Sequence, residues 1–250
     1  MENKWLYKKK YHIELSDVDF SKKLKLSSLF SYLQDVASHH VEQLGIGVNA
    51  LRDKFGVAWI LLRLRIDIKR LPMWNEDIYI ETWHHETRKL DFERDFIIYD
   101  SNGERIISAV STWVIIDVES RSIKRTEVLN FQYEEVKERA IDCKLGRLKS
   151  FNNEEVVYKK TVGYSDIDFN GHINNSKYVD FAMDCFPLDK HTEYRVTSVE
   201  VNYVNEALPG ETIILIKDNS KLEEGLLYLE GVNEKDEKAI FKSLVEVERI

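Results

Sequence analysis

The sequence is short of cysteine and has no long apolar run. Its two cysteines, Cys143 and Cys185, are too few among 250 residues for the disulfide framework of a small extracellular domain. No stretch approaches the roughly 20 apolar residues that a membrane span needs, and the run from Val57 to Leu62 ends at Arg63. The lysine-rich N-terminus has no apolar core of the kind that signal peptides carry. We therefore expect a cytoplasmic protein without a membrane span.

Several catalytic and cofactor motifs are also missing. The nucleophile elbow Gly-x-Ser-x-Gly does not occur, and neither do the glycine-rich motifs that bind nucleotides. The two histidine pairs are badly placed for a shared metal ion. The side chains of His39 and His40 point about 100° apart on a predicted helix, and those of His84 and His85 point to opposite faces of a predicted strand. We expect neither a cofactor nor a metal ion.

The charge is acidic overall, at −8, which argues against nucleic acid as a partner. Basic residues form short local clusters such as Lys22–Lys25. A cluster of this kind is either a solvated surface or a small docking patch for an acidic partner. Hydrophobic residues make up 43% of the chain and charged residues 32%, which is typical of a folded protein with a real core.

An internal repeat organises the chain. The segment Ser16–Phe20 (Ser-Asp-Val-Asp-Phe) recurs 149 residues later as Ser165–Phe169, with Ile in place of Val. The pair Leu71–Pro72 recurs as Leu208–Pro209, at a spacing of 137. The first copy therefore has about twelve extra residues between these two landmarks, and we place the insertion around residues 45–56.

Each copy is predicted to form one strand, one long helix and about four antiparallel strands. The apolar positions of the first helix are Leu26, Leu29, Phe30, Leu33, Val36 and Ala37. Those of the second are Tyr178, Phe181, Ala182 and Cys185, and this helix must stop near Pro187. The later strand-like runs are 78–83, 92–99 and 106–116 in the first copy, and 213–217, 226–231 and 240–247 in the second.

A helix packed on an antiparallel sheet is an α+β arrangement, here present twice. The charged, weakly patterned stretch Glu134–Glu155 lies between the copies. We assign residues 1–140 to an N-terminal domain, 141–155 to a linker and 156–250 to a C-terminal domain.

The candidate chemistry lies in the loop that follows the second copy of the motif. In an extended loop, the side chains of Asp168, Asn170 and His172 would point the same way, with Phe169 and Ile173 turned into the fold. A carboxylate, an amide and an imidazole in one place are suited to acyl transfer to water.

The start of the next helix adds to this site. Asn174 or Asn175 is a good N-cap. The positive end of the helix could then polarise a carbonyl and stabilise an oxyanion. The first copy keeps Asp19 but has Ser21 and Lys23 at the positions of Asn170 and His172, so we expect one active half and one scaffolding half.

The segment Asp168–Tyr178, Asp-x-Asn-x-His-x-Asn-Asn-x-Lys-Tyr, resembles the signature of acyl-acyl carrier protein thioesterases of plants and bacteria. The strands that contain Trp59–Arg65 and Ser111–Trp113 extend the resemblance over most of the chain. It implies two fused hotdog domains, each a long helix wrapped by an antiparallel sheet, with the acyl pocket in the N-terminal one and the catalytic residues in the C-terminal one. A fatty acyl chain on acyl carrier protein would be the substrate.

The resemblance also implies the roles of individual residues. The family's catalytic Asp, Asn and His fall on Asp168, Asn170 and His172, and its catalytic Glu falls on Glu206. At the spacing of 137, the first-copy equivalent of Glu206 is Lys69, which cannot act as a carboxylate base. The cysteine once proposed as the family's nucleophile is Ala207 here, which disfavours a Cys–His mechanism. The implied reaction is hydrolysis by an activated water, with Glu206 or Asp168 as the base; a covalent acyl-carboxylate route stays open.

Two other functions remain open from the sequence. One is a hotdog thioesterase acting on coenzyme A esters, or a hydratase. The other is a non-catalytic acyl-binding protein, against which the combination of Asn170, His172 and Glu206 argues. Chain-length preference and oligomeric state, a homodimer included, are not determined by these patterns.

Overall fold

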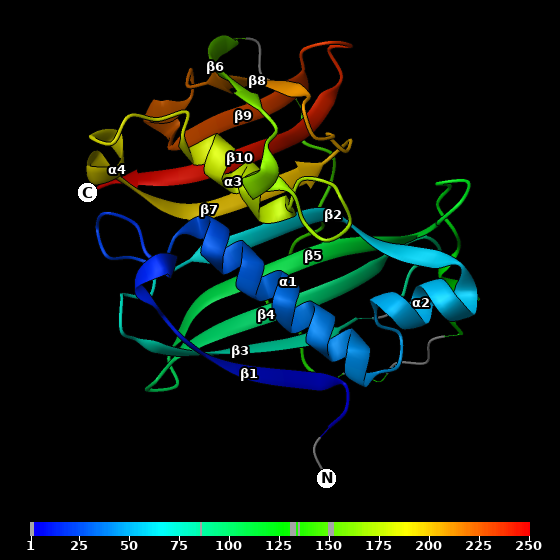
Figure 1. The fold of residues 1–250 in the computed structure, drawn as a ribbon. Coiled ribbons are helices and arrows are strands. Elements are labelled where there is room, and N and C mark those ends of the chain that lie inside the picture. Colours follow the sequence, from blue (N-terminus) through cyan, green and yellow to red (C-terminus); the bar gives the residue numbers. More distant parts are fainter. Residues whose placement is uncertain (1–2, 86, 131–133, 135, 150–152) are drawn as a thin grey trace. The chain divides into compact units, whose positions relative to one another are not determined.

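The computed structural model describes residues 3–85, 87–130, 134, 136–149 and 153–250 (Figure 1). The chain divides into two compact units. Unit 1 comprises residues 1–25 and 31–145, and unit 2 comprises residues 26–30 and 146–250.

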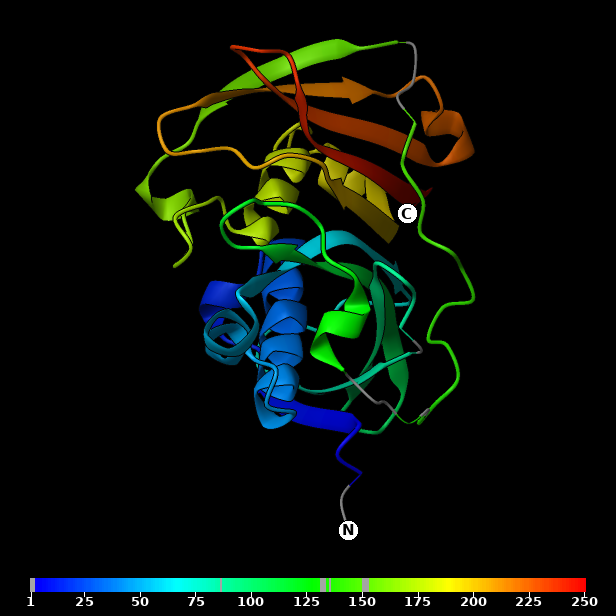
Figure 2. The same ribbon diagram turned by 90° about the vertical axis from the view of Figure 1, so that its right-hand side faces the viewer.

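Unit 1 contains five antiparallel strands in the spatial order β1-β3-β4-β5-β2. The strands are β1 (Leu6–His12), β2 (Val57–Ile68), β3 (Asp77–His84), β4 (Phe92–Asp100) and β5 (Arg105–Asp117). The helices that begin or lie in this part of the chain are η1 (Leu15–Asp17), α1 (Leu26–Gln43), α2 (Val48–Phe55) and η2 (Thr126–Leu129). Helix α1 runs across one face of the sheet (Figures 1 and 2).

Helix α1 forms because its apolar residues recur at helical spacing. All six predicted positions are buried, and they share one face of the helix because residues three or four positions apart lie one above another. The C-terminal end of α1 joins a core cluster with α2 and the strands, in which Val41 packs with Leu51 and Phe92. The predicted placement of the insertion at 45–56 is largely wrong, because α1 is itself nine residues longer than the corresponding helix Asn175–Met183. Residues 48–55 form α2, and Gly56 ends this helix in the left-handed conformation, with φ +64°.

Polar side chains interrupt the side of the sheet that faces α1. Arg94 on β4 is buried, and its guanidinium donates to His40 Nδ1 on α1 and to Thr82 Oγ1, both at 3.0 Å, and contacts His84 Nε2. Burial lowers the pKa of Arg94 to about 9. Burial and the charge of Arg94 lower the pKa of His40 to about 4, so this ring is neutral and can accept.

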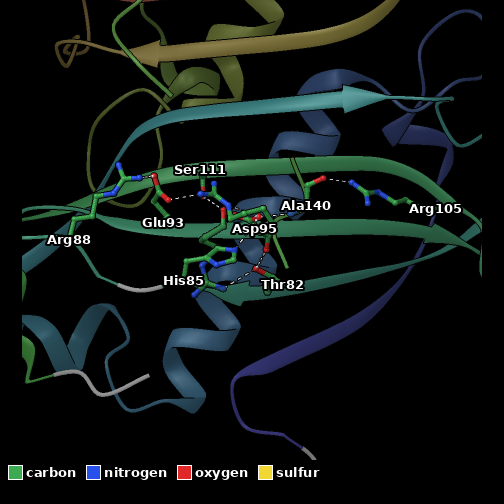
Figure 3. A network of polar contacts seen from close by, with 10 residues as sticks. Thr82, His85, Arg88, Glu93, Asp95, Arg105, Ser111 and Ala140 are labelled. Atoms are coloured by element: carbon green, nitrogen blue, oxygen red, sulfur yellow. Dashed lines mark hydrogen bonds and ion pairs between the residues drawn. The ribbon is translucent and has the colours of Figure 1, made fainter. Parts of the chain in front are cut away.

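The opposite side of the same sheet carries a second polar network, around Asp95 (Figure 3). Asp95 Oδ2 accepts from the backbone N–H of Ala140 at 2.6 Å and from Arg139 Nε at 3.1 Å, and lies 3.2 Å from His85 Nε2. Arg139 also bonds Glu93 at 2.7 Å. The segment around residue 140 is therefore fixed to unit 1. As predicted, neighbouring His84 and His85 lie on opposite faces of the strand.

Unit 2 repeats the arrangement with the strand order β7-β10-β9-β8-β6. The strands are β6 (Glu155–Thr161), β7 (Tyr194–Tyr203), β8 (Thr212–Asp218), β9 (Leu226–Asn233) and β10 (Ala239–Arg249). Its helices are η3 (Tyr164–Asp166), α3 (Asn175–Met183), α4 (Lys190–Glu193) and η4 (Leu222–Glu224). The Tyr178 ring of α3 packs on Phe241 of β10, with ring centroids 5.1 Å apart.

The second helix is shorter than predicted. Helix α3 has nine residues, against 18 in α1. Cys185 lies beyond its end and is buried in the turn that follows, so its apolar character extended the helical pattern past the helix. The predicted stop near Pro187 is correct.

The β-bulges show how closely the two copies agree. The pairing of β2 with β5 shifts between Leu61 and Arg63, and the pairing of β7 with β10 shifts at the equivalent place, next to Ser198. Strand β2 ends at Ile68 and β7 at Tyr203, an offset of 135 residues. The α+β class predicted from the sequence is confirmed. Among the described residues no helix is long and apolar enough to cross a membrane.

Candidate active site

The candidate loop of unit 2 is a tight turn, not the extended segment that we predicted. Ile167 and Ile173 pair in an isolated β-bridge. Within it, the N–H of Asp168 donates to the carbonyl of His172 at 2.9 Å, and the N–H of Gly171 donates to the carbonyl of Asp168 at 3.1 Å. Gly171 has φ +79°, a conformation that glycine adopts without strain.

Two residues anchor this turn to the fold. Asp166 is buried; its carboxylate accepts from the Gly163 N–H at 2.8 Å and pairs with Lys160 at 2.8 Å. Its carbonyl accepts from the N–H of Asn174 at 2.8 Å. Asn174 is the N-cap of α3, as predicted, and its side-chain oxygen accepts from the N–H of Ser176 at 3.0 Å. The start of α3 is thereby fixed next to the turn.

Two of the predicted site residues, His172 and Glu206, contact each other directly through their side chains. His172 Nε2 lies 3.2 Å from Glu206 Oε2, and the two side chains are 30% and 40% exposed. The carboxylate orients the imidazole and can stabilise an imidazolium that forms during a reaction. Because both groups are partly exposed, water can reach them.

The other two predicted residues make different contacts. Asp168 Oδ1 accepts from the backbone N–H of Asn170 at 2.8 Å, which holds the turn. Asn170 itself is exposed. Phe169, which we expected to turn inward, is 81% exposed, whereas Ile173 is buried as expected. The tight turn removes the simple alternation on which the prediction for Phe169 rested.

Two tyrosines, Tyr178 and Tyr203, hold Glu206 beside His172. Neither of them was predicted from the sequence as a site residue. The Tyr178 hydroxyl of α3 is hydrogen-bonded to the backbone of Ala207, next to Glu206. The Tyr203 hydroxyl at the end of β7 donates to the carbonyl of Asn175 at 3.3 Å. Burial raises the pKa of both phenols, which therefore stay neutral. Tyr178 appeared in the sequence only as an apolar position of the helix.

The first copy forms the same turn without the side chains predicted to be catalytic. The N–H of Asp19 donates to the carbonyl of Lys23 at 2.9 Å, as Asp168 does to His172. The Asp19 carboxylate accepts from the N–H and the hydroxyl of Ser21, both at 2.7 Å. Lys22 holds the position of Gly171 and has φ +61°.

Glu206 has no counterpart in the first copy, which corrects our equivalence with Lys69. The N–H of Lys69 donates to the carbonyl of Ile106, near the start of β5. In the same way, the N–H of Val204 donates to the carbonyl of Ile240, near the start of β10. Lys69 therefore matches Val204, at an offset of 135. The Leu-Pro corners differ by 137, so the second copy has two additional residues, Glu206 and Ala207. The insertion extends the chain beyond the strand and brings a carboxylate to His172.

Cys185 is poorly suited to nucleophilic catalysis. Cys185 is buried, its thiol donates to the Phe181 carbonyl at 3.4 Å, and burial raises its pKa to about 12. Ala207 is fully buried where the resembled family carries the cysteine once proposed as nucleophile. No group of three or more potential metal ligands gathers among the described residues.

Comparison with known proteins identifies two family domains along the chain. Residues 4–129 match the N-terminal domain of acyl-ACP thioesterases, and residues 149–243 match the C-terminal domain. An oleoyl-acyl carrier protein thioesterase of Arabidopsis thaliana is 24% identical over 93% of this chain and 68% of its own length. A palmitoyl-acyl carrier protein thioesterase of Gossypium hirsutum is 24% identical over 80% of this chain. The chain spans about half to two thirds of the length of these curated relatives.

Solved structures show the same fold. An acyl-ACP thioesterase from Bacteroides thetaiotaomicron superposes with a TM-score of 0.88 and 28% identity, over 99% of both chains. A 12:0-ACP thioesterase from Umbellularia californica has a TM-score of 0.82 at 17% identity, over 98% of both chains. The predicted hotdog architecture is thereby confirmed.

Proposed function

Because the chain belongs to the acyl-ACP thioesterase family, we propose that it hydrolyses fatty acyl thioesters of acyl carrier protein, releasing a free fatty acid. One observation supports the proposal most directly: the 3.2 Å contact between His172 and Glu206 beside the start of α3. An imidazole, a carboxylate and a helix N-terminus are the groups that water attack on a thioester requires.

The reaction needs a proton acceptor for the attacking water and a donor for the leaving thiolate. In the proposed mechanism the Glu206 carboxylate accepts a proton from the water as its oxygen bonds to the thioester carbon. Glu206 passes this proton to His172, which holds the water and then protonates the sulfur of the carrier's pantetheine arm as the carbon–sulfur bond breaks. Asp168 replaces Glu206 as the base in the alternative that we keep.

The oxyanion that forms on the thioester oxygen needs fixed positive groups. The N-terminal end of α3 supplies a partial positive charge, and the Asn170 amide is an exposed hydrogen-bond donor on the same turn. Losing one such donor typically costs about 10²–10³ in turnover. The acyl chain would lie in an apolar pocket, where each buried methylene contributes about 0.8 kcal/mol. We place this pocket in the N-terminal domain, as the family resemblance implies.

A hydrolysis screen tests the proposal. Purified enzyme is offered acyl carrier protein loaded with saturated and unsaturated chains of different lengths, and the same acyl groups on coenzyme A. We expect release of free fatty acid, with kcat/KM for the carrier-bound chain well above that for the coenzyme A ester. Preference for coenzyme A esters would instead support the alternative of an acyl-CoA thioesterase, and hydration of an enoyl ester without hydrolysis would support a hydratase.

A single turnover in ¹⁸O-labelled water separates the two hydrolytic routes. Direct attack by water places the label in the fatty acid. When water attacks the protein carboxyl carbon of a covalent acyl-carboxylate intermediate, the fatty acid instead keeps an unlabelled oxygen from the protein in the first turnover. We expect the first result, because the Glu206 carboxylate lies 3.2 Å from His172 Nε2 and can act as a base toward water.

A further inference from the structure

The turn of the first copy combines lysines with exposed apolar side chains. Lys22, Lys23 and Lys25 are all exposed. Phe20 is 56% exposed on the same turn, and the corner after β2 exposes Met73 and Trp74, by 42% and 46%.

Backbone hydrogen bonds join these residues into one surface within unit 1. The N–H of Trp74 donates to the carbonyl of Lys22 at 2.9 Å. Lys23 and Met73 pair in an isolated β-bridge. We call this surface the lysine face and define it as Phe20, Lys22, Lys23, Lys25, Met73 and Trp74.

The local charge of the lysine face differs from that of its counterpart in the second copy. Segments 14–25 and 69–76 carry five basic and four acidic residues, a net charge of +1. The equivalent segments 163–174 and 204–213 carry no lysine or arginine and four acidic residues, a net charge of −4. The whole chain has a net charge of −8, so the lysine face is a locally basic place on an acidic protein.

The acidic residues around the lysine face are held by other partners. The Asp19 carboxylate is bonded to Ser21 and to the N–H of Lys23. Glu76 pairs with Arg70 at 2.7 Å. By contrast, the ion pairs within the described residues include none formed by Lys22, Lys23 or Lys25, and Lys25 Nζ donates only to the Ser16 carbonyl, at 3.3 Å.

The backbone at Lys22 is left-handed, as it is at four other non-glycine residues among those that the structure describes. At φ +61° a lysine is strained, and the second copy has the unstrained Gly171 at this position.

We propose that the lysine face is the docking surface for an acidic carrier protein, which delivers the acyl chain on its pantetheine arm. The inference rests on the proposed function. It places the binding surface for the carrier protein on the first copy, which lacks the proposed catalytic groups. The lysines attract the acidic partner, while Phe20 and Trp74 supply apolar contact area at its centre.

Direct binding tests this assignment. The probe is acyl carrier protein whose pantetheine carries a fatty acyl group through a non-hydrolysable amide, titrated into the full-length protein. The variant Lys22→Glu/Lys23→Glu/Lys25→Glu should bind at least tenfold more weakly. The control variant Lys144→Glu/Lys221→Glu/Lys235→Glu changes net charge equally at exposed positions elsewhere and should stay within threefold of wild type. Equal losses in both variants, or none in the first, would overturn the proposal.

The variant Lys22→Gly separates docking from folding. Glycine relieves the left-handed backbone, so the melting temperature should stay the same or rise while carrier affinity falls by about threefold. Unchanged affinity would contradict a role for Lys22. A change in oligomeric state, without a change in carrier affinity, would mean that a second copy of the chain occupies the face. Failure of wild-type protein to hydrolyse any thioester would reject the proposed function, whereas the binding result bears on the lysine face alone.

Discussion

His172 and Glu206 meet at 3.2 Å although they lie on opposite sides of α3 and β7 in the sequence. His172 precedes the helix, and Glu206 follows the strand that packs against it. Their contact therefore depends on how well the helix and the strand end are held together. The hydroxyls of Tyr178 and Tyr203 provide that connection.

Removing the Tyr178 hydroxyl should displace the corner that carries Glu206. We expect Tyr178→Phe to lower kcat by about tenfold with little change in melting temperature, since a displacement of about 1 Å at an active site is costly. Tyr158→Phe is the matched control, because this tyrosine bonds the Phe181 carbonyl of the same helix at 2.8 Å but does not contact the corner. Equal kcat values for the two variants would mean that Tyr178 does not position Glu206.

The two copies of the turn should differ sharply in their sensitivity to mutation. Asn170→Ala and His172→Ala should each lower turnover by about 10² or more, the usual cost of a lost positioning or oxyanion donor. Ser21→Ala, at the position equivalent to Asn170, should leave kcat within about twofold. Steady-state kinetics on acyl carrier protein check both. Comparable losses from the two turns would show that the division into an active and a scaffolding copy is mistaken.

Neither thiol should be needed for turnover. The double variant Cys143→Ser/Cys185→Ser should keep activity within about tenfold of wild type. Any loss should accompany a lower melting temperature, because Cys185 is buried and a serine hydroxyl there costs stability. Complete inactivity of a double variant with a wild-type melting temperature would point to a thiol nucleophile.

The buried contact of His40 with Arg94 predicts a loss of stability in acid. The pKa of His40 falls from its ordinary 6.5 to about 4 in the folded state. Between these values the unfolded chain binds a proton that the folded chain does not. The free energy of unfolding therefore decreases as the pH falls from about 7 to about 4, by about 1–3 kcal/mol from this residue, and is unaffected above pH 7.

Denaturant unfolding at a series of pH values measures this effect. His40→Gln keeps an acceptor for Arg94 and does not titrate, so its stability should fall less steeply with acid than that of wild type. His39→Gln is the control, because His39 is the neighbouring histidine on α1 and is exposed. If the His40 variant shows the same acid slope as wild type, other groups cause the acid sensitivity.

Much of the fold could be predicted because the same sequence pattern occurs in both halves of the chain. The repeated motif, the helix pattern and the alternation of apolar residues located the strands of both copies. The length of α3 could not be predicted, because Cys185 is buried in a turn and continues the apolar pattern beyond the helix. The exposure of Phe169 followed from backbone hydrogen bonds that close the turn, and these leave no trace in the periodicity of side chains.

The site was predicted in part. The motif from Asp168 to His172 and its family resemblance selected the residues, and the structure joins His172 to Glu206. The equivalence of Glu206 with Lys69 was wrong. It was based on aligning the two Leu-Pro pairs, and this alignment hides the two-residue insertion that precedes Leu208–Pro209. The positioning roles of Tyr178 and Tyr203 depend on single hydroxyl groups and could not be seen in a sequence pattern.

The most direct test of the account is the turnover of Glu206→Gln on acyl carrier protein. Glutamine keeps the size and polarity of the side chain but cannot accept a proton from water. If Glu206 is the base, kcat should fall by about 10²–10⁴, equivalent to roughly 3–5 kcal/mol of barrier, with an unchanged melting temperature. Glu206→Asp should lose less. A kcat for Glu206→Gln within about threefold of wild type would contradict the assignment of Glu206 as the base and transfer that role to Asp168.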